Sequence, residues 1–275
     1  MPKLKKRHRK KLFLYGILIT FLGLIGAALL LLFPPKDDAS SVPKLTPQAP
    51  TDPSEGGYQP TDFYLDENGF MACRTTDCDT GIDISEHQKE VNWEKVKAAG
   101  VDFVFIRLGY RGSTEGKLYT DSMVKSHYEG AKAAGLQIGM YFYSQAITVE
   151  EAKEEAAFVL ENMADYTLDL PFIYDWEWGG EGSRTDIFAP GLQTELCEAF
   201  CRDIAAGGLS PMIYFNKNQG LRELDLEKLR DYPFWLALYD DTLDFPHTVS
   251  YWQYTDCGHV DGIEGNVDLN LRLPS

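Results

Sequence analysis

The fold is decided by a stretch that reads FVFIRLGY at residues 103–110, DSMVKSHYEGAKAA at 121–134 and IGMYFYS at 138–144. The first and third runs are short and mostly apolar, which is typical of buried strands. The middle run has a helical pattern and stops at Gly135, a residue that commonly follows the last turn of a helix. This strand–helix–strand unit predicts two parallel strands joined by a right-handed crossover.

The same alternation extends in both directions along the chain. Strands are predicted at residues 81–85, 171–178, 211–216, 234–239 and 250–255. Helices are predicted at residues 92–99, 148–165, 193–206 and 225–231. After residue 234 the helical patterns stop, so residues 266–273 read as strand and loop. Six or more mostly apolar strands favour an α/β fold closed into an irregular TIM-like barrel, whose chemistry lies at the carboxyl ends of the strands.

The charge of the chain is unevenly distributed. Seven of the 26 Lys and Arg residues lie in the first eleven positions, which leaves 19 basic against 42 acidic residues in the rest. Phosphate binding needs a basic surface, so nucleic acid is not expected as a partner. A basic wall polymer or an uncharged glycan is compatible with this charge.

A membrane anchor is predicted at residues 12–33, which carry no charge. As a helix they would span about 33 Å, enough for a bilayer core of about 30 Å. The basic residues before the span place residues 1–11 in the cytoplasm and the remainder outside the cell. The alternative is a cleaved signal peptide and a secreted protein. Against it, the apolar run is longer than a typical signal-peptide core, and no clear small-x-small cleavage site precedes Pro34.

Two further segments precede the main domain of residues 80–275. Residues 34–60 are rich in Pro, Ser, Thr, Asp and Gly, the composition of a disordered linker. Residues 61–79 contain two short apolar runs on either side of Asn68-Gly69, which predicts a small β-hairpin that packs on the entrance of the main domain. A disulfide between Cys73 and Cys78 is plausible outside the cell.

The remaining cysteines do not indicate a metal site. Cys197 and Cys201 lie one helical turn apart and are expected to be small buried residues, and Cys257 stands alone. No Cys/His spacing is typical of zinc, and no metal or other cofactor is expected.

Two acids end the predicted strand at residues 171–178. Side chains alternate along a strand, so Asp175 and Glu177 share one face and point to the mouth of the barrel. Like charges in a site of low dielectric raise one pKa, and glycoside hydrolysis needs one protonated and one ionised carboxyl. The alternative is that both acids are solvated loop residues.

Other strand ends carry polar residues as well. Asp83 lies at the end of the first strand, and Arg107 lies within the next one, where a charge is costly unless it is paired. Asp83 is the predicted partner of Arg107, in either a structural or a substrate-facing ion pair. Asp268 is a further acid beside an apolar run near the C-terminus.

Aromatic side chains near the same strand ends predict a carbohydrate groove, because sugars present apolar C–H faces rimmed by hydroxyl groups. Core packing is the alternative for each one alone. The predicted aromatic substrate-binding residues are Tyr141, Tyr143, Tyr214, Trp235, Tyr239, Trp252 and Tyr254.

Together these motifs resemble glycoside hydrolase family 25, the Chalaropsis-type lysozymes or N-acetylmuramidases, over roughly residues 80–274. The resemblance is carried by GIDISEHQ at 81–88, NW at 92–93, FIRLGY at 105–110, GMYFY at 139–143, DWE at 175–177, WQY at 252–254 and GNVDLN at 265–270.

The resemblance implies a (βα)5β3 barrel that hydrolyses the β-1,4 bond between N-acetylmuramic acid and N-acetylglucosamine in peptidoglycan. It implies that Glu177 is the general acid/base and that Asp175 assists, by orienting the 2-acetamido group of the substrate as an internal nucleophile. Asp83 and Asp268 would be supporting acids. Retaining, inverting and substrate-assisted mechanisms all remain compatible with the spacing of Asp175 and Glu177.

Two other functions fit the same residues. One is a chitinase-like hydrolase of another N-acetylated glycan, and the other is a non-catalytic module that binds the cell wall.

Overall fold

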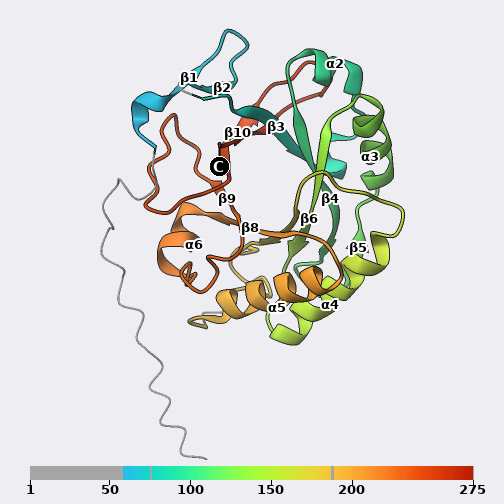
Figure 1. Ribbon diagram of the computed structural model, residues 1–275. Coiled ribbons are helices and arrows are strands. Elements are labelled where there is room, and N and C mark those ends of the chain that lie inside the picture. Colours follow the sequence, from blue (N-terminus) through green and yellow to red (C-terminus); the bar gives the residue numbers. More distant parts are fainter. Residues whose placement is uncertain (1–57, 75, 187–188, 275) are drawn as a thin grey trace, which may run out of the picture. The chain divides into compact units, whose positions relative to one another are not determined.

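The computed structural model describes residues 58–74, 76–186 and 189–274 (Figure 1). The predicted basic tail, membrane span and most of the predicted linker lie outside these ranges. Within the part of the chain that is described, no helix has both the length and the apolar character that crossing a bilayer requires.

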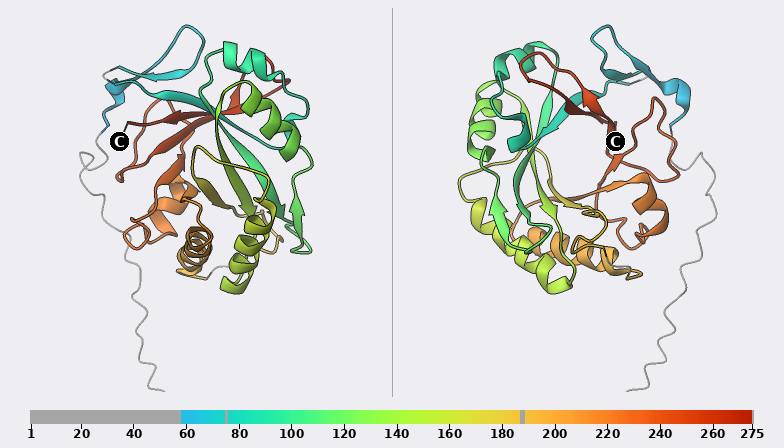
Figure 2. Two further views of the ribbon diagram at one scale, coloured as in Figure 1. Left: turned by 45° about the vertical axis from the view of Figure 1, so that its right-hand side comes forward. Right: turned by 180° about the vertical axis from the view of Figure 1, so that it is seen from behind.

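A closed barrel of eight strands forms the centre of the described structure (Figures 1 and 2). Its strands are β3 (Asp79–Ile84), β4 (Phe103–Arg111), β6 (Gln137–Ser144), β7 (Phe172–Trp176), β8 (Pro211–Asn216), β9 (Phe234–Ala237), β10 (Tyr251–Gly258) and β11 (Val267–Arg272). Each strand pairs with its neighbour, and the pairing of β3 with β4 closes the ring. A short strand, β5 (Leu118–Thr120), pairs with the end of β4 and was not predicted.

The strand directions decide which residues reach the mouth of the barrel. All neighbouring pairs from β3 through β4, β6, β7, β8 and β9 to β10 are parallel. The last strand, β11, is antiparallel to both β10 and β3. The start of β11 therefore lies at the carboxyl edge of the other strands, and Asp268 near this start is placed beside the end of β3.

Five helices connect the first six strands and cover the outside of the barrel (Figure 2). They are α2 (Trp93–Ala98), α3 (Val124–Ala133), α4 (Val149–Asn162), α5 (Leu192–Ala206) and α6 (Lys217–Arg222). Five strand–helix units followed by three strands is the expected architecture. Asn92 caps α2 by accepting a hydrogen bond from Lys95 N (3.1 Å), and Thr148 caps α4 by accepting one from Glu151 N (3.2 Å).

One helix prediction was wrong. Residues 225–231 form turns, and the helix lies earlier, at α6. A capping box explains the shift, because Asn216 accepts from Gln219 N (3.1 Å) and the Gln219 side chain accepts from Asn216 N (2.9 Å).

Apolar side chains pack on both sides of the barrel wall. The outward side chains of the strands pack against the helices in one large core. The inward side chains form a second core that fills the barrel interior, with Phe103, Phe105, Ile173, Met212 and Trp235 among its members. Because the interior is packed, any groove has to lie at the rim.

The predicted hairpin consists of β1 (Phe63–Leu65) and β2 (Met71–Cys73), which pair antiparallel and follow the 3-10 turn η2 (Pro60–Asp62). Its turn is closed by the Asp66 side chain, which accepts hydrogen bonds from the backbone N–H of Asn68 (2.9 Å) and Phe70 (2.8 Å). The predicted disulfide joins Cys73 to Cys78. Cys197 and Cys201 are buried in α5, as predicted.

The hairpin packs against the outer face of β10. The Phe63 ring lies 5.1 Å from the Trp252 ring, centroid to centroid, and Met71 N donates to the Tyr254 hydroxyl (3.1 Å). These two contacts occupy the outward side chains of β10.

Candidate active site

The predicted acids meet in one groove at the carboxyl edge of the barrel strands. Its lining includes Asp83, Arg107, Tyr141, Tyr143, Asp175, Glu177, Tyr214, Trp235, Tyr239, Gln253 and Asp268. These side chains come from β3, β4, β6, β7, β8, β9, β10 and β11 or from the loops that follow them. The barrel therefore collects residues that are far apart in the chain.

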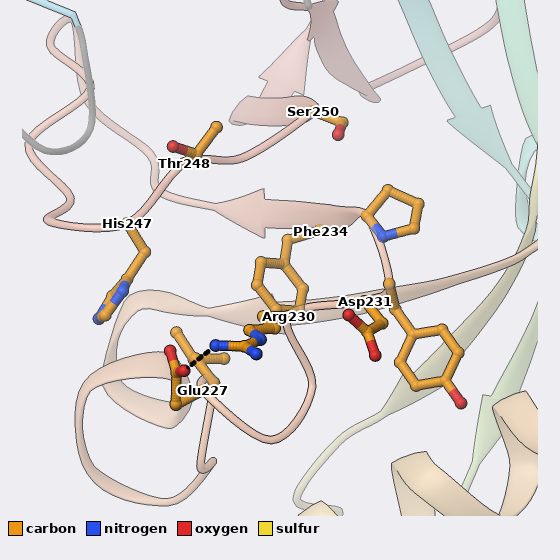
Figure 3. A pocket seen from close by; sticks show the side chains of 10 residues that line it. Glu227, Arg230, Asp231, Phe234, His247, Thr248 and Ser250 are labelled. Atoms are coloured by element: carbon orange, nitrogen blue, oxygen red, sulfur yellow. Dashed lines mark hydrogen bonds and ion pairs between the residues drawn. The ribbon is translucent and has the colours of Figure 1, made fainter.

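A second pocket lies at the opposite ends of the strands. It is lined by residues at the starts of β9 and β10, including Phe234 and Ser250, together with His247 and the ion-paired Glu227 and Arg230 (Figure 3). It contains none of the predicted catalytic acids. Active sites of such barrels lie at the carboxyl ends of the strands, so we assign the site to the groove.

Asp175 and Glu177 are placed by the end of β7. Asp175 is the penultimate residue of the strand, and its side chain is only 6% exposed. Glu177 follows the last strand residue. Its carbonyl accepts from Gln145 Nε2 (2.5 Å), and Trp176 O accepts from Gln219 Nε2 (3.0 Å). The buried side chains of Gln145 and Gln219 therefore hold the two backbone carbonyl groups that flank the Glu177 Cα atom.

Asp83 and Asp268 form a second acidic pair. They are direct partners in the antiparallel register of β3 and β11. Asp83 Oδ2 accepts from Gln253 Nε2 (2.9 Å) and from Asn270 Nδ2 (2.8 Å). Two amide donors thus hold Asp83 on the inner wall of the groove.

Burial and mutual repulsion raise the pKa values of the acids in the groove. Burial, then the charges of Glu177 and Asp83, raise the pKa of Asp175 well above its usual range. Burial, then the charge of Asp83, raise the pKa of Glu177. Burial and the neighbouring Asp83 raise the pKa of Asp268 to about 9. Burial also raises the pKa of Asp83, and its hydrogen bonds from Asn270 and Gln253 oppose that shift. Burial and mutual repulsion therefore favour the protonated form at each of these four acids.

Asp175 has one oxygen that is free to bind a substrate. Its Oδ1 is buried and has no hydrogen-bond partner among the described residues. Buried acceptors normally have a partner. An N–H group of a bound ligand would supply one here.

Five of the seven predicted aromatic residues line the groove: Tyr141, Tyr143, Tyr214, Trp235 and Tyr239. The prediction was wrong for Trp252 and Tyr254, which pack outward against the hairpin. Alternation along β10 is the reason, because the residue between them, Gln253, is the one that points inward.

Arg107 lines the groove, but its predicted pairing with Asp83 was wrong. Its Nε donates to Asp121 (2.8 Å), and its Nη2 donates to Glu86 (3.1 Å) in the 3-10 turn η3 (Glu86–Gln88). The register explains the difference, since Asp83 lies opposite Phe105, and Arg107 lies beyond the last residue of β3.

Sequence reasoning missed the amide side chains Gln145, Gln253 and Asn270. All three are buried and hydrogen-bond in or next to the groove. Their signal was available, because a Gln or Asn inside an apolar strand is costly to bury without a partner. In the described part of the chain, no group of three or more His, Cys, Asp or Glu side chains has the geometry of a metal site.

Comparison with known proteins identifies relatives of the barrel over most of its length. Residues 82–263 match the model of the glycosyl hydrolases family 25. The autolytic lysozyme of Clostridium acetobutylicum is 33% identical over 193 residues, which are 69% of this chain and 54% of the clostridial protein.

Solved structures show the same fold. The modular autolysin LytC of Streptococcus pneumoniae, solved in complex with a synthetic peptidoglycan ligand, superposes with a TM-score of 0.65 at 23% identity, over 77% of this chain and 52% of that one. A family GH25 lysozyme from Aspergillus fumigatus has a TM-score of 0.58 at 28% identity, over 72% and 95%. The chain thus spans about half the length of the clostridial and pneumococcal proteins.

Proposed function

The chain belongs to glycosyl hydrolase family 25, and from this premise we propose that it is a peptidoglycan hydrolase of the muramidase type. The proposed reaction cleaves the β-1,4 bond between N-acetylmuramic acid and N-acetylglucosamine. The observation that carries the proposal is the convergence of Asp83, Asp175, Glu177 and Asp268 on one aromatic-lined groove.

Glu177 is the proposed general acid/base. Burial and the charge of Asp83 raise its pKa, which favours the protonated form that gives a proton to the leaving glycosidic oxygen. Gln145 and Gln219, which donate to the carbonyls of Glu177 and Trp176, fix the position of its backbone. After the bond breaks, the Glu177 carboxylate takes a proton from the attacking water and returns to its starting state.

Asp175 is the proposed orienting group for substrate assistance. Its free Oδ1 accepts the N–H of the 2-acetamido group, which directs the acetamido oxygen toward the anomeric carbon. The oxygen attacks that carbon as the glycosidic bond breaks, and water then opens the cyclic intermediate. Two displacements at one carbon retain its configuration.

Product analysis tests the function. The protein is incubated with purified peptidoglycan and, in parallel, with chitin, and the new reducing ends are identified. We expect N-acetylmuramic acid at the reducing ends from peptidoglycan, in the β configuration when first released. Cleavage of chitin alone would overturn the muramidase proposal in favour of a chitinase-like hydrolase.

We further propose that residues 12–33 anchor the protein in the cell membrane, with residues 1–11 in the cytoplasm and the barrel outside. The uncharged run, the basic residues before it and the Cys73–Cys78 disulfide support this location. Lytic activity is then expected to stay with membranes after a high-salt wash. A soluble form that begins just after residue 33 would show instead that the segment is a signal peptide.

A further inference from the structure

Two buried amide side chains, Gln253 and Asn270, converge on a single oxygen of the groove. Both donate to Asp83 Oδ2, at 2.9 Å from Gln253 Nε2 and 2.8 Å from Asn270 Nδ2. Both residues are fully enclosed, with exposures of 2% and 0%. Neither has a role in the reaction proposed above.

The orientation of the Asn270 amide is set by Trp235. Trp235 Nε1 is 2.8 Å from Asn270 Oδ1, and an indole nitrogen can only donate a hydrogen bond. The oxygen of Asn270 must therefore face Trp235, which leaves the NH₂ group facing Asp83.

The orientation of the Gln253 amide is set by two tyrosines. Its Oε1 accepts from the Tyr214 hydroxyl (2.9 Å) and the Tyr239 hydroxyl (3.1 Å). Burial raises the pKa of both phenols, so both keep the protons that they donate. The NH₂ group of Gln253 is thus also directed at Asp83.

We propose that Gln253 and Asn270 are positioning residues that keep Asp83 ionised and leave the proton of the acidic pair on Asp268. The two N–H donors on Asp83 Oδ2 stabilise the ionised form of Asp83 and oppose burial, which raises its pKa. Asp268 lies opposite Asp83 across β3 and β11, and burial and the neighbouring Asp83 raise the pKa of Asp268 to about 9, which favours Asp268 as the holder of the proton.

This arrangement acts on Glu177 through the charge of Asp83. The other carboxyls facing this pair are Asp175 on β7, Glu177 after β7 and Asp256 on β10. The phenols are Tyr141, Tyr143, Tyr214 and Tyr239, and His87 and Arg107 complete the titratable and charged groups. Arg107 is already paired with Asp121 and Glu86 and does not neutralise Asp83. A fixed negative charge at Asp83 therefore favours the protonated form of Glu177.

The inference rests on the proposed acid role of Glu177, and the pH dependence of kcat/KM tests it in the full-length protein. Gln253→Met keeps the length of the side chain but removes the donor to Asp83. We expect the alkaline limb of the profile, where Glu177 loses its proton, to move down by about one pH unit. The matched control is Tyr239→Phe, which removes a bond to Gln253 Oε1 but keeps the donor, and its alkaline limb is expected to stay in place. Equal shifts in the two variants, or none in Gln253→Met, would overturn the inference.

A second measurement does not depend on activity. Infrared spectra of full-length protein with ¹³C-labelled aspartate report carboxyl protonation, and Asp83→Asn and Asp268→Asn assign the bands. We expect an ionised Asp83 and a protonated Asp268 at pH 7, and loss of the ionised Asp83 band in Gln253→Met. A protonated Asp83 in the unmodified protein would refute the inference even if the enzyme cleaves peptidoglycan. The expected bands in a protein without lytic activity would instead refute only the proposed function.

Discussion

Asp83 and Asp268 lie directly opposite each other in the antiparallel register of β3 and β11, and burial and the charge of Asp83 raise the pKa of Asp268 to about 9. The pair forms one wall of the groove, and Asp175 and Glu177 at the end of β7 complete the set of acids. Because Asp83 and Asp175 are buried and Glu177 and Asp268 are half-buried, each added negative charge is costly, and this cost favours a protonated acid in the groove.

Glu177→Gln is expected to lower the rate of muropeptide release by about two to four orders of magnitude, because it removes the proton donor and keeps the shape of the side chain. Release is measured by chromatography of digested peptidoglycan. Glu181→Gln is the matched control, since Glu181 is an exposed acid on the loop after β7. Unchanged release by Glu177→Gln would show that another group is the acid.

Asp175→Asn is expected to lower kcat far more than it raises KM. The amide keeps an oxygen for the substrate N–H but loses the charge that orients and polarises the acetamido group. Steady-state kinetics on a soluble glycan fragment separate the two constants. An effect on KM alone would mean that Asp175 only binds the substrate.

Arg107→Met is expected to lower the free energy of unfolding by about 3–5 kcal/mol, because it leaves the fully buried Asp121 carboxylate without its cation. Lys95→Met removes an exposed pair with Asp261 and should cost less than about 1 kcal/mol. Chemical denaturation measures both.

In a double-mutant cycle, Arg107→Met and Asp83→Asn should show little coupling in the free energy of unfolding, since the structure does not pair these two residues. A large coupling energy would contradict this.

Stability is expected to fall as the pH rises from about 5 to 8, in part because of Glu155. Glu155 is fully buried behind the groove, where it accepts hydrogen bonds from Arg111 Nε (2.7 Å) and from Ser144 Oγ (2.7 Å). Burial raises its pKa from 4.5 to about 7. Because the pKa of Glu155 is higher in the folded than in the unfolded protein, the protonated side chain stabilises the fold. This contribution is fully present below about pH 4.5 and is lost as the pH rises through 7, which lowers the free energy of unfolding by about 3 kcal/mol.

Glu155→Gln should flatten that dependence, because the neutral amide keeps the shape without the titration. Glu154→Gln is the control, since the Glu154 side chain is 63% exposed. Unfolding midpoints between pH 5 and 8 measure the slopes. Equal slopes in Glu155→Gln and the unmodified protein would exclude Glu155 as the source.

Tyr239→Ala and Trp252→Leu should show which of the two residues binds substrate in the groove and which one stabilises the core. Tyr239 lines the groove and is 52% exposed, so its loss is expected to raise KM several-fold with little change in stability. Trp252 is fully buried beneath the hairpin, and its truncation should cost about 2–4 kcal/mol of stability while KM stays the same. The opposite pattern would place Trp252 in the site.

Three of the four predicted acids, Asp83, Asp175 and Glu177, were found in one groove because a local rule places each of them, whereas the antiparallel direction of β11 places Asp268. Alternation along a strand sets the face of a side chain, and parallel strands bring their carboxyl ends to one edge. For β10 the prediction placed Trp252 and Tyr254 on the inward face, although these two residues point outward and Gln253 between them points inward. An apolar residue on either face of a strand between barrel and helices is equally well buried, so Trp252 and Tyr254 carried no signal of their direction. The polar Gln253 between them did carry one, because only the groove offers a buried amide polar partners.

The sequence by itself determined the order of strands and helices, the hairpin turn, the position of the acids on their strands and the resemblance to a family, since each follows from spacing along the chain. Only the tertiary structure decided which residues meet across strands. The partner of Arg107 depends on the stagger of β3 against β4, and the Asp83–Asp268 pair depends on β11 running antiparallel. Stagger and direction come from the packing of the whole barrel, and no local stretch of sequence encodes them.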